Sequence, residues 1–200
     1  MTGLVTNLLD MARLQAGSIH LNRQWSMLEE TVGAALAASR GVLACQPVQV
    51  RVPADLPLLQ LDAVLMERLF ANLLKNAAKY TPPGTPILIG AALEHEGDAR
   101  FVHVCIDDEG PGEPSGMQSR LFDKFTRGEK ESAQPGIGLG LAICRAFVEA
   151  HGGKTGVWNR VDAGGARFWF TLPADEKPPE DVPPDEELGS KAAAPGAGDV

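Results

Sequence analysis

Two asparagines and a lysine recur at helical spacing near the middle of the chain. Asn72, Asn76 and Lys79 are four and three residues apart, so on a helix their side chains fall within a wedge of about 60°. Amide oxygens are hard ligands suited to Mg²⁺, and a neighbouring lysine suits a phosphate. We interpret this helix face as one wall of a pocket for a magnesium-bound nucleotide; the alternative is a solvated amphipathic face.

The same stretch carries a separate apolar face. Its residues are Met66, Leu69, Phe70, Leu73 and Ala77. We expect this face to lie in the core, and a buried helix rarely adds a second stripe of amides because each unpaired amide costs about 1–3 kcal/mol. Asp62 stands just before the helix and is predicted to cap it.

A carboxylate precedes two glycines at the end of a predicted strand. Asp108 is followed by Gly110 and Gly112. The carboxylate can accept a hydrogen bond from an amine, and the glycines let a flat ring approach the backbone. Ordinary hairpins use the same residues, so a plain turn is the alternative.

Three glycines at alternate positions open a later helix. Gly136, Gly138 and Gly140 precede Leu141, and glycines there expose successive backbone amides at a helix N-terminus, which favours phosphate. The spacing differs from the Gly-x-Gly-x-x-Gly of dinucleotide-binding folds. The alternative is tight packing of an apolar helix.

Two phenylalanines lie between the glycine elements. Phe122 and Phe125 can anchor a mobile segment to the body of the domain, from which Arg127 and Lys130 can reach phosphates. The alternative is a plain core helix, and a short helix is predicted over 117–124.

The hydrophobic periodicity predicts an ordered series of elements. Strands are expected at 48–52, 58–61, 85–94, 100–107, 155–159 and 165–172, and helices at about 28–38 after the capping-box spacing at Ser26 to Glu29, at the asparagine stretch, and at 138–150. This order predicts an α+β fold, a two-layer α/β sandwich with its helices on one face of the sheet. Alternating βαβ units are absent, which excludes a Rossmann fold.

The composition excludes several classes of protein. The chain has 200 residues, 44% of them hydrophobic, and a net charge of −8. From Pro173 onward it has eight acidic and two basic residues, so the rest is close to neutral and offers no electrostatic case for nucleic acid. No apolar run is long enough to span a membrane. The three cysteines, Cys45, Cys105 and Cys144, lack metal-ligand spacing and are predicted to be small buried residues in a reducing compartment.

In combination, these motifs resemble the catalytic ATP-binding domain of sensor histidine kinases, whose N, first-glycine, F and second-glycine boxes follow one another in this order. Within that family the chain is most similar to the KdpD-type potassium-responsive sensor kinases. The residues that carry this closer likeness are 7–13 with 15–17, 122–128 with 130–133, 140–146 and 151–153.

The resemblance implies a fold, cofactors and roles. It implies the Bergerat fold shared by histidine kinases, gyrase, Hsp90 and MutL, with ATP and Mg²⁺ bound. Asn76 would bind Mg²⁺ with Asn72 beside it, and Lys79 would bind phosphate. Tyr80 would cover the ribose or adenine, and Asp108 would accept a hydrogen bond from the adenine amine. Asn72 and Lys79 are the catalytic candidates. The other cofactor-binding candidates, some on a lid spanning about 123–136, are Gly110, Gly112, Phe125, Arg127, Gly136, Gly138, Gly140 and Leu141.

The chain is expected to have three segments. The resemblance implies that residues 1–17 are the remnant of a second dimerisation helix and 18–173 the catalytic domain. The composition of 174–200 predicts an acidic, proline-rich tail that is disordered. The domain is expected to be cytoplasmic, without membrane contact of its own, whereas full-length homologues would be anchored to the inner membrane. A response regulator is the partner that the family implies.

The family's phosphoacceptor histidine is followed by an acidic residue and, a few positions on, by a proline. The four histidines of the chain are His20, His95, His103 and His151. None has that context, since even His95, which Glu96 follows, falls in a predicted hairpin turn. We therefore expect transfer of the ATP γ-phosphate to a histidine supplied by another chain or a missing N-terminal region, with little or no autophosphorylation.

Two other functions remain open from the sequence. One is a non-catalytic nucleotide-binding or dimerisation module. The other is an ATP hydrolase of the gyrase, Hsp90 and MutL type, in which a glutamate activates water. Asn72 occupies that position here, and an amide cannot act as a general base.

Overall fold

The computed structural model describes residues 21–113, 116–118, 120–123, 138–160 and 164–174. Their elements follow the order expected from the sequence, with one additional short strand at the start. They are β1 (Gln24–Ser26), α2 (Leu28–Ser39), β2 (Val48–Arg51), β3 (Leu59–Leu61), α3 (Ala63–Tyr80), β4 (Ile87–Glu96), β5 (Ala99–Asp107), α4 (Gly140–Ala150), β6 (Thr155–Asn159) and β7 (Ala166–Pro173).

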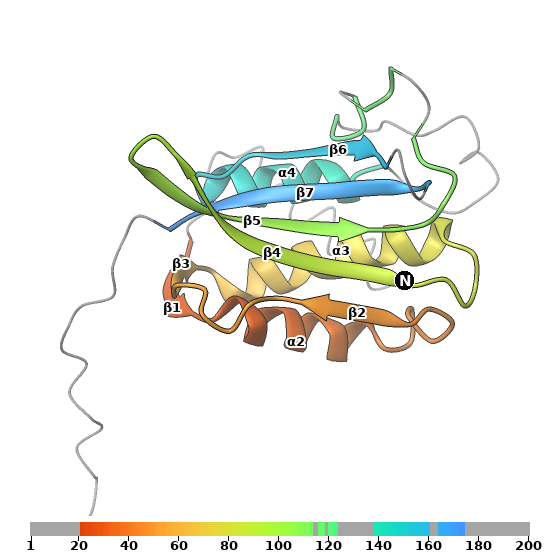
Figure 1. Ribbon diagram of the computed structural model, residues 1–200, viewed down its shortest axis with the longest axis horizontal. Helices are drawn as coiled ribbons and strands as arrows, with labels where there is room; N and C mark the ends of the chain where they lie inside the picture. The colour runs from red at the N-terminus through yellow and green to blue at the C-terminus, as the bar shows by residue number, and fades with distance from the viewer. Residues whose placement is uncertain (1–20, 114–115, 119, 124–137, 161–163, 175–200) are drawn as a thin grey trace, which may run out of the picture.

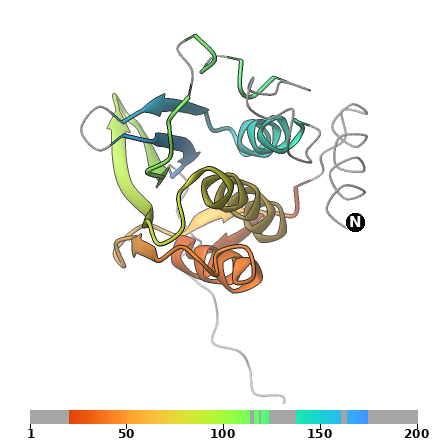
Figure 2. The ribbon, with the colours of Figure 1, turned by 90° about the vertical axis from the view of Figure 1, so that its right-hand side faces the viewer.

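The strands form one large sheet and one small one. The five-stranded sheet has the order β2-β4-β5-β7-β6, and β1 pairs with β3 in a separate two-stranded sheet. β2 lies parallel to β4, whereas the other neighbours in the large sheet are antiparallel. The three helices cover one face of this sheet (Figures 1 and 2). The predicted α+β two-layer sandwich is confirmed.

The core lies between this sheet face and the helices. Val102, Val104 and Ile106 of β5 point toward the helices and are fully buried, whereas Phe101, His103 and Cys105 alternate to the outer face. The apolar face of α3 packs against them, and Phe70 meets Phe170 of β7 edge to face at 5.6 Å. The predicted apolar face of α3 is buried at every position.

One predicted helix cap is confirmed and one is wrong. Asp62 caps α3, because its Oδ1 accepts from Leu65 N at 3.1 Å. The capping box at Ser26 does not form: Met27 is the N-cap residue of α2, without a side-chain cap bond. Ser26 is instead the last residue of β1, paired with Leu59, and its hydroxyl donates to Gln24 O at 3.2 Å.

Three further predictions need correction. In place of a helix over 117–124, the described residues form turns, with Leu121 N donating to Met117 O at 3.0 Å. His95 lies within β4, one residue before its end and paired with Arg100, rather than in the turn that follows the strand. Cys45 is exposed and Cys105 is half-buried, so that only Cys144 is buried as predicted.

Several predictions fall on residues that the structure does not describe. They are the helix expected over 1–17, most of the lid, and the tail beyond residue 174. Phe125, Arg127 and Gly136 also lie outside the described residues. Among the helices that are described, none is both long enough and apolar enough to cross a membrane.

Candidate functional site

The predicted site is built along the polar side of α3. Asn72, Asn76, Lys79 and Tyr80 are all half-buried there, and the helical rise separates the first from the last by about 12 Å. The start of α4 meets one end of this stretch, since a Cβ placed on Gly140 would lie 4.0 Å from the Asn72 side chain. The loop after β5 meets the other end at Tyr80 (Figure 1).

Asp108 is held rigidly at the Tyr80 end of this stretch. The residue is 4% exposed, and its Oδ1 accepts from Gly110 N at 2.8 Å and from Ala166 N at 3.2 Å. Among the described residues Oδ2 accepts no hydrogen bond, so one lone-pair edge of this carboxylate is left for a ligand. Burial raises the pKa of Asp108 above its ordinary value, while these two backbone amides and Arg160 oppose the rise.

Gly110 brings the Asp108 loop against α3. A Cβ at this position would lie 2.9 Å from Tyr80 O and 3.0 Å from Asp108 Oδ1. Any larger residue would therefore push the loop away from the helix. The approach of a flat ring to this backbone, which the sequence suggests, stays a prediction.

The loop after β5 is also held by hydrogen bonds from the end of β6. Asn159 accepts from Glu113 N at 2.7 Å and donates to Glu113 O at 2.8 Å. Gly112 precedes Glu113 and has φ of 71°, and a Cβ at this position would lie 3.0 Å from Asn159 Oδ1. Arg160 donates to Asp108 O at 3.0 Å. These supports were missed from the sequence, because they act across the sheet.

Gly165 is a second feature that the sequence reasoning missed. Its φ is 81°, and a Cβ there would lie 2.0 Å from Asp108 O. Only glycine allows the turn before β7 to lie against the backbone of Asp108. The adjacent pair Gly164–Gly165 was a signal for such an approach, but the sequence pattern assigns residue 165 to the start of a strand.

The neighbouring Asp107 carries a buried charge that is fully paired. It is 1% exposed, and Arg167 donates to both of its carboxylate oxygens. Arg160 Nε lies 3.8 Å from Asp107 Oδ2. The pKa of Arg167 is raised by this hydrogen bonding. Two arginines therefore balance the charge directly behind Asp108.

The start of α4 offers backbone amides without a side-chain cap. Gly138 has φ of 72°, and Leu139 is the N-cap residue, whose side chain makes no cap bond. Gly140 and Leu141 begin the helix, and Ile143 N donates to Leu139 O at 3.0 Å. The first amides of a helix are donors that favour an anion.

Asn72 also belongs to the interface between α3 and α4. Its side chain hydrogen-bonds to Cys144, and burial raises the pKa of that thiol to about 12. The Cys144 thiol also lies 3.8 Å from Leu69 O. Asn72 is thus held in place by the same helix whose first turn it faces.

Lys79 and Tyr80 form a polar pair at the end of α3. Lys79 Nζ donates to the Tyr80 hydroxyl at 2.7 Å and lies 4.6 Å from the centre of the ring. No group of three or more His, Cys, Asp or Glu residues in the described ranges could hold a metal. A Mg²⁺ ion at Asn76 would therefore depend on phosphate oxygens and water for the rest of its shell.

The structure gathers most of the predicted site residues into one region. Those it describes there are Asn72, Asn76, Lys79, Tyr80, Asp108, Gly110, Gly112, Gly138, Gly140 and Leu141. The arrangement places a carboxylate at one end of a half-buried polar wall and uncapped helix amides near the other.

The fold and this site define a class of protein. Residues 61–176 match the family model described as "Histidine kinase-, DNA gyrase B-, and HSP90-like ATPase", and the chain belongs to that family.

Sensor kinases are among its relatives. The chain is 47% identical over 177 residues to the sensor protein KdpD of Escherichia coli, covering 88% of this chain and 19% of that protein. It is 37% identical to KdpD of Clostridium acetobutylicum, covering 86% and 19%. The chain thus spans about a fifth of the length of these relatives.

A solved histidine kinase has the same fold. The crystal structure of full-length ShkA in complex with AMPPNP superimposes with a TM-score of 0.72 at 27% identity, covering 85% of this chain and 35% of that one. The Bergerat-type fold predicted from the sequence is therefore confirmed.

Proposed function

We propose that this chain is the catalytic domain of a sensor histidine kinase, which binds Mg-ATP and transfers the γ-phosphate to a histidine. The observation that carries the proposal is Asp108, a buried carboxylate with one oxygen held by two amides and the other available beside α3. Family membership and the AMPPNP-bound relative support ATP as the ligand.

The adenine would occupy the Tyr80 end of the site. Asp108 Oδ2 would accept from its amine, and Gly110 leaves room for the ring to approach the backbone. The Tyr80 side chain would cover the ribose or the adenine. A buried acceptor oxygen of this kind selects a base that carries an exocyclic amine, because a base without the amine would leave the oxygen unsatisfied.

The phosphates would run along α3 toward the start of α4. The phosphates would meet backbone groups there, at Gly138, Gly140 and Leu141. Lys79 would leave its contact with Tyr80 to bind phosphate. Asn76, with Asn72 beside it, would hold Mg²⁺, which neutralises charge on the phosphates. In the transfer itself, the bond from the γ-phosphorus to the ADP oxygen breaks and a bond to the acceptor nitrogen forms.

We propose that the acceptor histidine lies outside these 200 residues. His95 lies in β4, His103 lies on the outer face of the sheet, and His151 is buried with both ring nitrogens bonded; His20 lies outside the described residues. Without a tethered acceptor the transfer should be slow, because positioning supplies much of the rate. A response regulator would then take the phosphate from that histidine.

A hydrolase is less well supported. The position at which a hydrolase of this family carries a glutamate is Asn72, whose amide bonds Cys144 and cannot take a proton from water. Steady ADP release without any acceptor would revive the hydrolase.

The test is transfer of label from γ-labelled ATP with Mg²⁺. The chain is incubated alone and with a separately purified acceptor-helix domain of a KdpD-type kinase. We expect label on the added acceptor only, and its loss with Asp108→Asn. Strong labelling of the chain itself would contradict the proposed acceptor, and nucleotide binding without transfer to either protein would favour a non-catalytic binding module.

A further inference from the structure

The outer face of the large sheet carries an aromatic groove. This groove, on the side opposite the helices, has a volume of about 390 Å³ and is lined by Phe101, His103, Trp158 and Trp169 among others. The two indole rings have centres 5.5 Å apart, and His103 lies 5.7 Å from Trp169. Trp158 is 41% exposed. Aromatic surface of this kind on a solvent face commonly marks a binding site.

A glycine makes the floor of the groove flat. Gly156 of β6 pairs with Trp169 of β7, and a Cβ on Gly156 would lie 2.6 Å from the indole of Trp169. The ring therefore lies directly over the backbone of the edge strand. Nothing in the proposed nucleotide site requires this arrangement, since that site lies on the helical side of the sheet.

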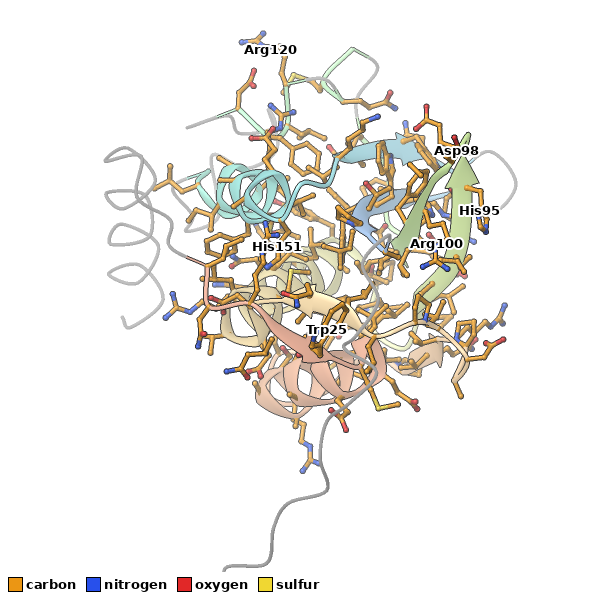
Figure 3. All side chains as sticks on the ribbon, turned by 90° about the vertical axis from the view of Figure 1, so that its left-hand side faces the viewer. Trp25, His95, Asp98, Arg100, Arg120 and His151 are labelled. Carbon is orange, nitrogen blue, oxygen red and sulfur yellow. The ribbon has the colours of Figure 1, made fainter. Side chains whose placement is uncertain are left out.

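The C-terminal segment begins at the rim of the same groove. Pro173 is one of the lining residues. Ala174 is held to Arg100 of β5 by two hydrogen bonds: its N–H donates to Arg100 O at 2.8 Å, and its carbonyl accepts from the Arg100 guanidinium at 2.8 Å. Figure 3 shows Arg100 on this end of the sheet, near His95 and Asp98. Residues 175–200, which the structure does not describe, therefore start within reach of the aromatic rings.

The composition of that segment suits the groove. It contains two proline pairs, Pro178–Pro179 and Pro183–Pro184, with Glu180 and Asp181 between them. Proline-rich segments dock into aromatic-lined grooves because their extended conformation loses little entropy on binding. The exposed Lys154 at the rim can meet the acidic residues.

We propose that residues 178–184 of this chain dock into the aromatic groove. Three residues separate Ala174 from Pro178, and the four steps from residue 174 to residue 178 span about 12 Å in an extended chain. This is enough to cross two neighbouring strands at about 4.8 Å each. Glu94 and Glu96 also line the rim, paired with His103 at 3.7 Å and with Lys154 at 3.9 Å, and they oppose the acidic residues. The contact is therefore weak. It persists because the segment is covalently joined to β7, which gives the segment an effective concentration of about 1 mM at the groove.

The test uses the indole N–H signals of the full chain in NMR spectra. The chain has three tryptophans, and Trp25→Phe and Trp158→Phe identify their signals. Replacing the four prolines 178, 179, 183 and 184 by alanine should shift the signals of Trp158 and Trp169 and leave that of Trp25, on β1, unchanged. Pro195→Ala is the matched control, and should shift none of them.

Three outcomes would overturn the proposal. Identical Trp158 and Trp169 signals in the chain and the fourfold alanine variant would show that the segment does not touch the groove. Signals that move with protein concentration, equally in both proteins, would show that a second copy of the chain covers this face. In the otherwise unchanged chain, Lys154→Gln should shift the signals of Trp158 and Trp169 in the same direction as the fourfold alanine variant does. A shift in the opposite direction would contradict docking.

Discussion

At the scale of single residues, the site depends on a carboxylate whose burial disfavours its charge. Asp108 keeps two backbone donors on Oδ1, yet burial raises its pKa. A raised folded-state pKa means that protonation favours the folded state. This contribution is full below the ordinary value of 3.8 and is lost as the pH rises through the folded value. At neutral pH the charge therefore serves ligand binding at a cost in stability.

Asp108→Asn should separate binding from folding. The amide oxygen can still accept from Gly110 and Ala166, so we expect a thermal midpoint equal to or above that of the unchanged chain. Loss of a charged acceptor should weaken ATP binding by about 10- to 100-fold. Fluorescent-nucleotide titration and thermal melts measure the two effects, and unchanged affinity would remove Asp108 from the site.

The pH dependence of binding follows from the same residue. As the pH falls through the raised pKa of Asp108, the carboxylate takes up a proton and ATP affinity should fall, beginning above the ordinary value of 3.8. The Asp108→Asn variant should lack this step. Equal pH profiles in both proteins would assign the step to another group.

At the scale of elements, His151 joins the end of α4 to the start of α3. Its Nε2 accepts from Asp62 N at 3.0 Å, and Nδ1 donates to Phe147 O at 2.7 Å. Figure 3 shows His151 at the end of α4 on the side of β1. Burial lowers its pKa below 6.5. The unfolded chain therefore binds the proton more tightly than the folded protein does. The contribution of His151 to the stability of the fold is full above pH 6.5 and falls as the pH drops below that value.

His151→Ala should lower the free energy of unfolding by about 1–3 kcal/mol at neutral pH, because it leaves buried backbone groups unpaired. It should also flatten the decline in stability below the ordinary His pKa. Urea unfolding over a series of pH values measures both effects. His95→Ala is the control, since that side chain is exposed, and a loss of equal size there would contradict the role of His151.

The turn before β7 provides a matched pair of glycines. Gly164 and Gly165 have φ of 70° and 81°, but a Cβ meets nothing within 4 Å at the first and Asp108 O at 2.0 Å at the second. Each alanine should cost about 1–2 kcal/mol for its backbone conformation. Gly165→Ala should cost clearly more and also weaken ATP binding. Equal effects of the two variants on unfolding and affinity would show that the contact with Asp108 has no consequence.

At the scale of the whole molecule, the sequence predicted what local patterns determine. α3 and the hairpin β4–β5 were predicted because helical and alternating periodicities are strong there. β1 was missed because its last residue, Ser26, stands at capping-box spacing and was assigned to the start of a helix, whereas in the structure it pairs with Leu59 of β3. The supports of Asp108 from Asn159, Arg160 and Gly165 were missed because they arise only when β6 and β7 are in place.

The parallel pairing of β2 with β4 has a consequence for the order of folding. The antiparallel β4–β5 hairpin closes across the two residues Gly97 and Asp98, whereas β2 meets β4 only after β3 and the whole of α3 have been traversed. Pairings distant along the chain must overcome a larger loop-closure entropy. We therefore expect β2 to join the sheet late, so that destabilising changes in β2 mainly speed unfolding, whereas those in the hairpin slow refolding.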